Sequence, residues 1–176
     1  RKTLIHPNAV GEFSALDLIP DEQVVVAITR GNYIKRMPIT AYRTQIRGGE
    51  GVLGMTTKDE DEIEHMMSCS THDDVFFFTN SGRVFLTKVY EIPTSSRQAK
   101  GTPIVNVIQM TNSEKVTTAM VQTAGGDESK KYFVFATRNG QIKRTPIEAY
   151  NNVRKTGIVA MRLDTADQLK WVHRTS

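Results

Sequence analysis

The sequence predicts an all-β, propeller-like protein, and two observations carry this prediction. One pattern occurs three times along the 176 residues, and each copy consists of short runs typical of strands. The copies begin at Thr29 (TRGNYIKRMP), Thr79 (TNSGRVFLTK) and Thr137 (TRNGQIKRTP), so they lie 50 and 58 residues apart. A period of this size is typical of propeller blades or repeat arrays.

Each copy is expected to hold about four strands. The runs before the threonines, VVVAI, VFFF and YFVFA, are apolar and rich in β-branched or aromatic residues, as in buried strands. The pairs GN, SG and NG that follow tolerate the positive φ of a tight hairpin turn. Second strands then alternate apolar and charged residues, third strands follow Gly51, Gly101 and Gly157, and fourth strands (IEHMMSCS, KVTTAMVQT and LKWVHRT) follow the loops KDEDE, TNSEK and DTADQ.

The repeats divide the chain as follows. Residues 1–22 form a lead-in, with a short turn expected at 14–18, and the repeats cover about 23–72, 73–123 and 131–176. Residues 124–130 (AGGDESK) are expected to be a flexible hairpin insertion. The lack of an initiating methionine favours a piece of a longer protein. The single cysteine, Cys69, excludes a disulfide framework within one chain and fits a reducing compartment, and no apolar run approaches a membrane span.

Basic residues are concentrated at one step of the repeat. The windows 29–51, 79–101 and 137–157 contain fourteen of the 23 Lys and Arg but only three of the 19 Asp and Glu. They therefore carry a net charge of +11, whereas the rest of the chain carries −7 and the whole chain +4. A repeat that places cations at the same step of each blade produces a positive rim, for which a long polyanion is the natural partner.

The order of these motifs resembles a known family. The run QVVVAITRGNYIKRMPITAYRTQIRGGEGVLGM, followed by EHMMSCSTHDDVFFFTNSGRVFLTKVYEIP, is similar to the C-terminal DNA-wrapping domain of DNA gyrase A subunits, and RKTLI…EFSALDLIPDEQ resembles the junction before that domain. The resemblance implies a β-pinwheel, a propeller-like ring of four-stranded blades with DNA bent around its basic rim. About three blades, the first part of such a domain, are expected. The paralogous subunit of topoisomerase IV has a related domain.

The glycine-rich stretch after the first hairpin resembles the gyrase box, usually Gln-Arg-Arg-Gly-Gly-Lys-Gly. Here it comprises Gln45, Ile46, Arg47, Gly48, Gly49, Glu50 and Gly51. The glycines would let the backbone approach phosphate closely, and Arg47 can pair with a phosphate. Ile46 and Glu50 replace two cations, a change of about three charge units that predicts a flatter salt dependence. It is either a weaker gyrase box or the degenerate version of a topoisomerase IV subunit.

The resemblance implies a non-catalytic module that binds double-stranded DNA through phosphates rather than base edges. Its parent would be an enzyme of two A and two ATPase B subunits that introduces negative supercoils, is cytoplasmic and nucleoid-associated in bacteria, and binds ATP and Mg²⁺ outside this chain. No cofactor, metal or membrane partner is expected for the chain itself. The predicted rim residues outside the box are Arg30, Lys35, Arg36, Arg43, Arg83, Lys88, Arg97, Lys100, Arg138, Lys143, Arg144, Arg154 and Lys155.

Other interpretations of the same residues are weaker. The RGGEG stretch lacks the Lys-Ser/Thr and the helix of a nucleotide-binding loop. His65, Cys69 and His72 lack zinc-site spacing, and the acidic run 59–64 with Asp73 and Asp74 lacks the pattern of a calcium loop, so packing, turn and solvated-loop roles are expected. The recurring Tyr42 and Tyr150 are expected to pack at blade corners. A propeller-like protein-interaction module is the alternative from another functional class.

Overall fold

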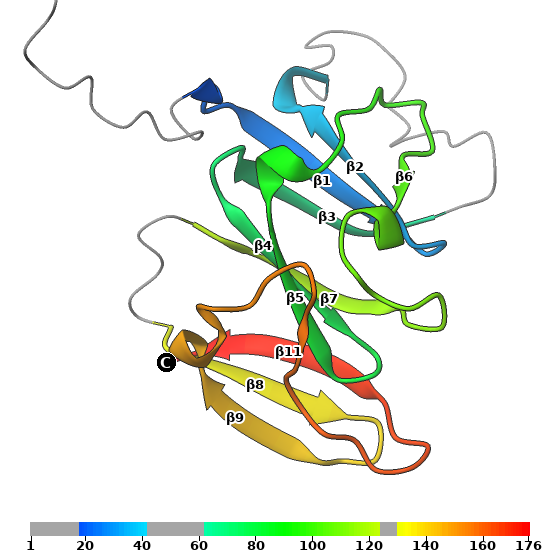
Figure 1. The fold of residues 1–176 in the computed structure, drawn as a ribbon, viewed down its shortest axis with the longest axis vertical. Helices are drawn as coiled ribbons and strands as arrows, with labels where there is room; N and C mark the ends of the chain where they lie inside the picture. Colours follow the sequence, from blue (N-terminus) through cyan, green and yellow to red (C-terminus); the bar gives the residue numbers. More distant parts are fainter. Residues whose placement is uncertain (1–17, 42–61, 124–129) are drawn as a thin grey trace, which may run out of the picture.

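The computed structural model describes residues 18–41, 62–123 and 130–176. Within these ranges it is an all-β arrangement of three antiparallel sheets that follow one another along the long axis of the molecule (Figure 1). The helical segments are single 3₁₀ turns, η2 (Ile39–Ala41), η3 (Val89–Glu91), η4 (Ile104–Asn106) and η5 (Ile147–Tyr150). None of the helices in the described ranges is long and apolar enough to cross a membrane. The predicted propeller-like all-β class is confirmed.

Each sheet is built around one hairpin. Sheet 1 has the order β3-β1-β2-β6, with β1 Gln23–Thr29, β2 Tyr33–Pro38, β3 Ile63–Ser70 and β6 Thr102–Pro103. Sheet 2 has the order β10-β5-β4-β7, with β4 Asp74–Thr79, β5 Arg83–Lys88, β7 Val116–Gln122 and β10 Ile158–Val159. Sheet 3 has the order β11-β8-β9, with β8 Tyr132–Thr137, β9 Ile142–Pro146 and β11 Leu169–Thr175.

The hairpins form where the sequence predicts them. The apolar runs are β1, β4 and β8, and the predicted fourth strands are β3, β7 and β11. The turns need one residue with positive φ, and Asn32 (60°), Gly82 (78°) and Gly140 (89°) supply it. This conformation is open to glycine and tolerated by asparagine, which explains the GN, SG and NG pairs.

The third strands of the second and third repeats lie in a different sheet from the one that the repeat pattern predicts. In the structure β6, from the second repeat, pairs with β2 of sheet 1, and β10, from the third repeat, pairs with β5 of sheet 2. Each hairpin otherwise leaves a row of unpaired backbone groups on its outer strand, and the short strand of the next repeat satisfies part of it. Consecutive sheets are therefore joined by strand exchange.

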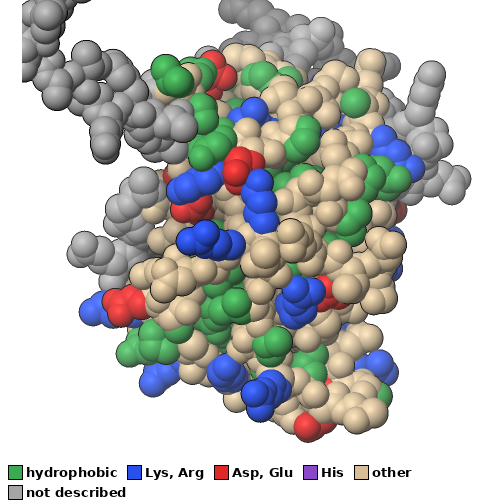
Figure 2. Space-filling view, in the orientation of Figure 1, with side chains coloured by type: hydrophobic (Ala, Val, Ile, Leu, Met, Phe, Trp, Pro, Cys, Tyr) green, Lys and Arg blue, Asp and Glu red, His purple; other side chains and the backbone are tan. Residues whose placement is uncertain are grey.

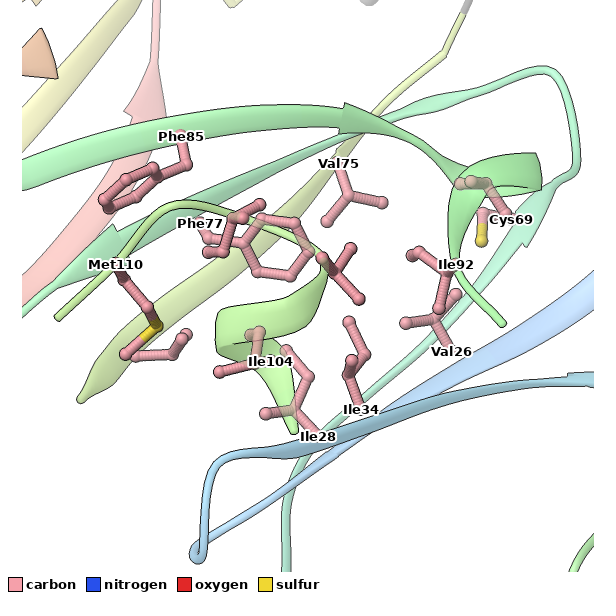
Figure 3. Close-up of a cluster of buried hydrophobic side chains, with 14 of the residues drawn as sticks. Val26, Ile28, Ile34, Cys69, Val75, Phe77, Phe85, Ile92, Ile104 and Met110 are labelled. Atoms are coloured by element: carbon pink, nitrogen blue, oxygen red, sulfur yellow. The ribbon is translucent and has the colours of Figure 1, made fainter. Parts of the chain in front are cut away.

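The core lies between the sheets, and β4 contributes to both halves of it. Val75 and Phe77 point toward sheet 1, where they meet Ile28 and Ile34, with Ile104 of η4 in the gap (Figure 3). On the opposite face of β4, Phe76 and Phe78 pack against sheet 3, and the Phe78 and Phe133 rings meet edge to face at 5.2 Å. Alternation along β4 therefore directs its side chains to two neighbouring sheets. Aromatic rings thus fill the interior, and the basic rim must be sought on the outer strands and loops.

Candidate nucleic-acid interface

The first candidate element is the loop that leads from sheet 2 back to sheet 1, residues 92–101, here called the first junction loop. It runs along the outer edge of β2, because the Arg36 N–H donates to the Pro93 carbonyl at 3.1 Å and the Ser95 N–H donates to the Arg36 carbonyl at 2.9 Å. The Arg36 guanidinium also donates to Thr94 Oγ1 at 2.9 Å. The loop thereby brings Arg97 and Lys100 to the strand that carries Arg36.

The second junction loop, residues 151–157, repeats this arrangement between sheets 2 and 3. The Leu86 N–H of β5 donates to the Arg154 carbonyl at 3.4 Å, and the Gln109 N–H donates to the Lys155 carbonyl at 2.8 Å. The Arg154 side chain is exposed, whereas the Lys155 ammonium pairs with Glu91 at 3.1 Å. Each boundary between two sheets therefore presents a short basic loop.

Several predicted rim residues reach the surface. In Figure 2, lysine and arginine side chains are spread over all three sheets of the face shown, with fewer acidic side chains among them. Two of the cations lie on tyrosine faces, since the Lys100 ammonium is 4.4 Å from the Tyr33 ring and the Arg144 guanidinium is 4.6 Å from the Tyr132 ring. Such contacts fix a long side chain while its charge stays at the surface. The exposed members of the predicted set are Arg30, Lys100, Arg138, Lys143, Arg144 and Arg154.

Lys35 does not belong to the exposed rim. Its side chain is 1% exposed, and its ammonium donates to the carbonyl oxygens of Arg97, at 2.9 Å, and of Ala99. A phosphate cannot reach this nitrogen without displacing the first junction loop. The burial of Lys35 contradicts its prediction as a rim residue that contacts DNA, because the first junction loop covers the end of its side chain.

Three other predicted cations are engaged in ion pairs. The Arg83 guanidinium donates to Glu114 at 3.1 Å and to the Thr156 carbonyl at 2.9 Å. It therefore links β5 of sheet 2 to the second junction loop. Lys88 pairs with Asp74 at 2.9 Å, and Arg30 pairs with Glu62 at 2.9 Å. Arg30 and Glu62 are each about two-thirds exposed, and a pair of this kind contributes little to stability and separates readily for another anion.

The gyrase-box-like stretch, Gln45, Ile46, Arg47, Gly48, Gly49, Glu50 and Gly51, lies outside the described residues, as do Arg43 and Tyr42. The junction loops are its counterparts in the later repeats when the three glycines are aligned. Arg97 and Lys100 precede Gly101 by the same steps by which Arg47 and Glu50 precede Gly51. This alignment is a signal in the sequence that relates the first junction loop to the gyrase-box-like stretch. The second repeat has a cation where the first has Glu50.

Acidic side chains fix the hairpin turns of sheets 2 and 3, a role that the sequence analysis does not predict. Glu114 is buried and accepts hydrogen bonds from the hydroxyls of Thr79 (3.1 Å) and Ser81, from the Thr111 N–H (2.7 Å) and from Arg83. In the next repeat Asp167 accepts from the Asn139 N–H at 3.0 Å. The available signal was the recurrence of an acid at the fourth position of TNSEK and DTADQ, with a threonine at the start of each hairpin turn.

The remaining sequence candidates have structural roles in the described ranges. Cys69 lies in the core between sheets 1 and 2, and burial raises the pKa of its thiol to about 11. His72 Nε2 donates to the Ile19 carbonyl at 2.7 Å, and Asp73 accepts from the Ser70 N–H at 2.8 Å, so both fix a turn. Tyr150 is buried in the cluster between sheets 2 and 3, in agreement with the expected packing role. One exposed cation outside the windows, Arg162, lines a surface hollow beside Lys143.

Comparison with known proteins matches this arrangement to one family. A family model described as the DNA gyrase C-terminal domain, beta-propeller, matches residues 23–70, 73–123 and 131–176. The A subunit of DNA gyrase from Staphylococcus epidermidis is 42% identical over 176 residues, which are 100% of this chain and 20% of that protein. The chain thus spans one fifth of the length of the curated relatives that it matches.

Two solved structures have the same fold. The C-terminal domain of DNA topoisomerase IV superposes with a TM-score of 0.73 and 28% identity, over 89% of this chain and 47% of that one. The DNA gyrase A C-terminal domain superposes with a TM-score of 0.60 and 26% identity, over 86% of this chain and 46% of that one. With three matched segments and a relative similar over its full length, the chain belongs to the DNA gyrase C-terminal domain family.

Proposed function

We propose that this chain binds double-stranded DNA without reading its sequence and bends it along the two junction loops. The observation that carries the proposal is the repetition of a basic loop at each boundary between sheets, with Arg36, Arg97 and Lys100 at the first and Arg154 at the second. Cations repeated at each boundary along an array of sheets suit a long polyanion that runs along the array. Their contacts offset a bending cost of about 1–6 kcal/mol for a duplex of 20–30 base pairs.

In this proposal the chain is a non-catalytic part of a bacterial type IIA topoisomerase. The whole enzyme would contain two A subunits and two ATPase B subunits, act on DNA in the cytoplasm in association with the nucleoid, and use ATP and Mg²⁺ bound outside this chain. The bent duplex would present a crossing of defined hand to the DNA gate, so that strand passage introduces negative supercoils. The match of the whole chain to gyrase A subunits supports this assignment.

The test is a titration with duplexes of about 20 and about 60 base pairs at several salt concentrations. We expect the affinity to fall steeply with salt and the longer duplex to bind more tightly than its additional sites explain. Replacing both Arg97 and Lys100 by Gln should flatten the salt slope by about 1.8, since each lost phosphate contact removes about 0.9. The matched control replaces Lys115 and Lys170, which are exposed and lie outside the junction loops. Binding that is absent or insensitive to salt contradicts the proposal and favours a protein-interaction module.

A second candidate is the equivalent domain of topoisomerase IV, which would serve relaxation and decatenation. The topoisomerase IV C-terminal domain gives the higher TM-score of the two domains compared, and Ile46 and Glu50 depart from the usual gyrase box. Assays of the whole enzyme separate the two candidates. Negative supercoiling of relaxed plasmid supports gyrase, whereas ATP-dependent decatenation without supercoiling supports topoisomerase IV. Restoring Arg and Lys at positions 46 and 50 should strengthen wrapping in either case.

A further inference from the structure

Lys35 is a buried cation held by main-chain oxygens. It is among the largest fully buried side chains of the described residues, and its ammonium donates to the carbonyls of Arg97 and Ala99. Burial lowers its pKa. A charged group removed from water is costly unless its donors are satisfied, so opening the loop would leave this ammonium without these acceptors. The conformation of the loop and the position of Lys35 are therefore coupled.

The carbonyls that Lys35 holds belong to the segment that presents the cations of the first junction loop. A turn is closed by the Ala99 N–H, which donates to the Ser96 carbonyl at 3.3 Å. The turn directs the Arg97 and Ala99 carbonyls inward to the ammonium, and the exposed Lys100 follows directly. The far end of the loop is fixed as well, because Gly101 passes so close to β2 that an added Cβ would lie 2.7 Å from the Ile34 carbonyl oxygen.

We propose that Lys35 is a positioning residue for DNA binding, which fixes the first junction loop so that Arg97 and Lys100 face the duplex. This inference rests on the proposed function and adds a residue that acts through the loop without contacting DNA. A cation inside the turn draws the carbonyl dipoles inward. The loop is thereby preorganised, and its two outer cations lose little further freedom when they meet phosphate.

The second junction loop is not held by a buried lysine, so the proposed role of Lys35 is specific to the first junction loop. The residue of β5 at the position of Lys35 is Phe85, whose ring lies against Gly157, where an added Cβ would be 2.4 Å away. The second junction loop is held instead by Arg83, which donates to the Thr156 carbonyl, and by the pair of Lys155 with Glu91. Removal of the Lys35 ammonium should therefore affect the first junction and leave the second in place.

A double-mutant cycle on duplex binding by the whole 176-residue chain tests the proposal. Lys35→Met keeps the apolar length of the side chain and removes the ammonium. We expect it to weaken binding by roughly tenfold near 0.1 M salt, the size of one lost phosphate contact, and to flatten the salt slope. In a chain that already carries Arg97→Gln and Lys100→Gln, the same change should have no further effect. Lys115→Met, which removes one exposed charge elsewhere, is the control.

Three outcomes would overturn the proposal. Equal weakening by Lys35→Met in both backgrounds indicates general destabilisation, and an unchanged affinity in the parent background indicates no role. In either case the proposed function stands if Arg97→Gln with Lys100→Gln still weakens binding. Absence of duplex binding by the unsubstituted chain overturns both proposals.

Amine labelling of the unsubstituted chain provides a measurement that does not depend on the folding of a variant. Lys35 should be acylated at least tenfold more slowly than Lys100, because its nitrogen is enclosed by the loop and Lys100 is exposed. Duplex DNA should then slow the labelling of Lys100. Equal labelling rates of Lys35 and Lys100 in the folded chain would contradict the proposal.

Discussion

The hairpins β1–β2 and β8–β9 share the pattern TR…IKR.P, yet their second strands differ in burial. Ile34 of β2 is fully buried, whereas Ile142 of β9, at the matching position, is 74% exposed. Lys35 is buried and Lys143 is exposed, although Lys143 also donates to a carbonyl, that of Ala160 at 2.6 Å. The difference follows from strand exchange, since β6 pairs with β2 while the described residues place no strand on the outer edge of β9.

This comparison shows where the stability of a repeat comes from. A hairpin supplies its own turn and inner strand, but its outer strand becomes core only when the next repeat adds a strand and an apolar turn. In sheet 1 that turn is η4, whose Ile104 is buried against Ile28 and Ile34. Repeat arrays are stabilised by such interfaces between neighbours as much as by single repeats. Truncating the same residue type should therefore change the free energy of unfolding by very different amounts in the two hairpins.

The largest contrast is expected between Ile34→Ala and Ile142→Ala. Ile34 is enclosed by the core cluster between sheets 1 and 2, so truncation leaves a cavity and should lower the free energy of unfolding by about 2–5 kcal/mol. Ile142 is mostly in water, so its truncation should change stability by less than about 0.5 kcal/mol. Urea denaturation followed by circular dichroism measures both. Losses of similar size would refute the view that the following repeat confers the burial.

A smaller contrast is expected between two glycines with positive φ. Gly140, in the turn of the exposed hairpin, has φ of 89° and no atom within 4 Å of an added Cβ, so Gly140→Ala should cost only the conformational strain of about 1–2 kcal/mol. Gly101 has φ of 94° and would also bring its Cβ to 2.7 Å from the Ile34 carbonyl oxygen. Overpacking adds about 1–3 kcal/mol there. Thermal unfolding of the two variants tests this, and equal losses would show that β6 moves aside freely.

The sequence predicted the hairpins because their signals are local. Apolar runs, positive-φ pairs and the period of the repeat are properties of neighbouring residues, and β1, β4 and β8 lie where these signals place them. Strand exchange could not be predicted, because nothing in the segments Thr102–Pro103 or Ile158–Val159 states which sheet they join. The burial of Lys35 follows from that exchange. A lysine in an alternating strand has the pattern of a solvated charge, and its acceptors come from residues more than 60 positions away.

The turns of the hairpins β1–β2 and β8–β9 make the same main-chain hydrogen bond, although the outer strands of these hairpins differ in burial. The Arg30 N–H donates to the Glu62 carbonyl and the Arg138 N–H to the Gln168 carbonyl, each at 2.8 Å. At the same step in sheet 2, the Asn80 N–H donates to the Lys115 carbonyl, directly after the buried Glu114. This hydrogen bond of each turn thus comes from its own repeat. In sheets 1 and 2 the next repeat adds others, since the Ile104 N–H donates to the Asn32 carbonyl at 2.8 Å and the Ala160 N–H donates to the Gly82 carbonyl at 2.9 Å.

The contribution of Glu114 to the turn of sheet 2 should depend on pH. Burial by itself raises the pKa of Glu114, but hydrogen bonds from Ser81, Thr111 and Thr79 and the charge of Arg83 outweigh it and hold the pKa below its ordinary value. Since the folded-state pKa is depressed, the carboxylate stabilises the fold above the unfolded-state pKa, and this contribution is lost as pH falls through the folded value. Glu114→Gln should cost about 1–3 kcal/mol at neutral pH, with the difference from the parent chain shrinking in acid.

Urea midpoints from neutral pH to about pH 3 measure this difference, with the exposed Glu148→Gln as the matched control. A constant gap between Glu114→Gln and the parent across this range would show that the side chain acts by shape alone. If the difference in urea midpoint from the parent chain disappears in acid for Glu114→Gln and is small at every pH for Glu148→Gln, the stabilisation comes from the Glu114 carboxylate in the turn of sheet 2. The turn of sheet 2 would then be fixed by the Glu114 carboxylate of its own repeat as well as by the Ala160 and Met161 N–H groups of the next repeat, which donate to the Gly82 carbonyl.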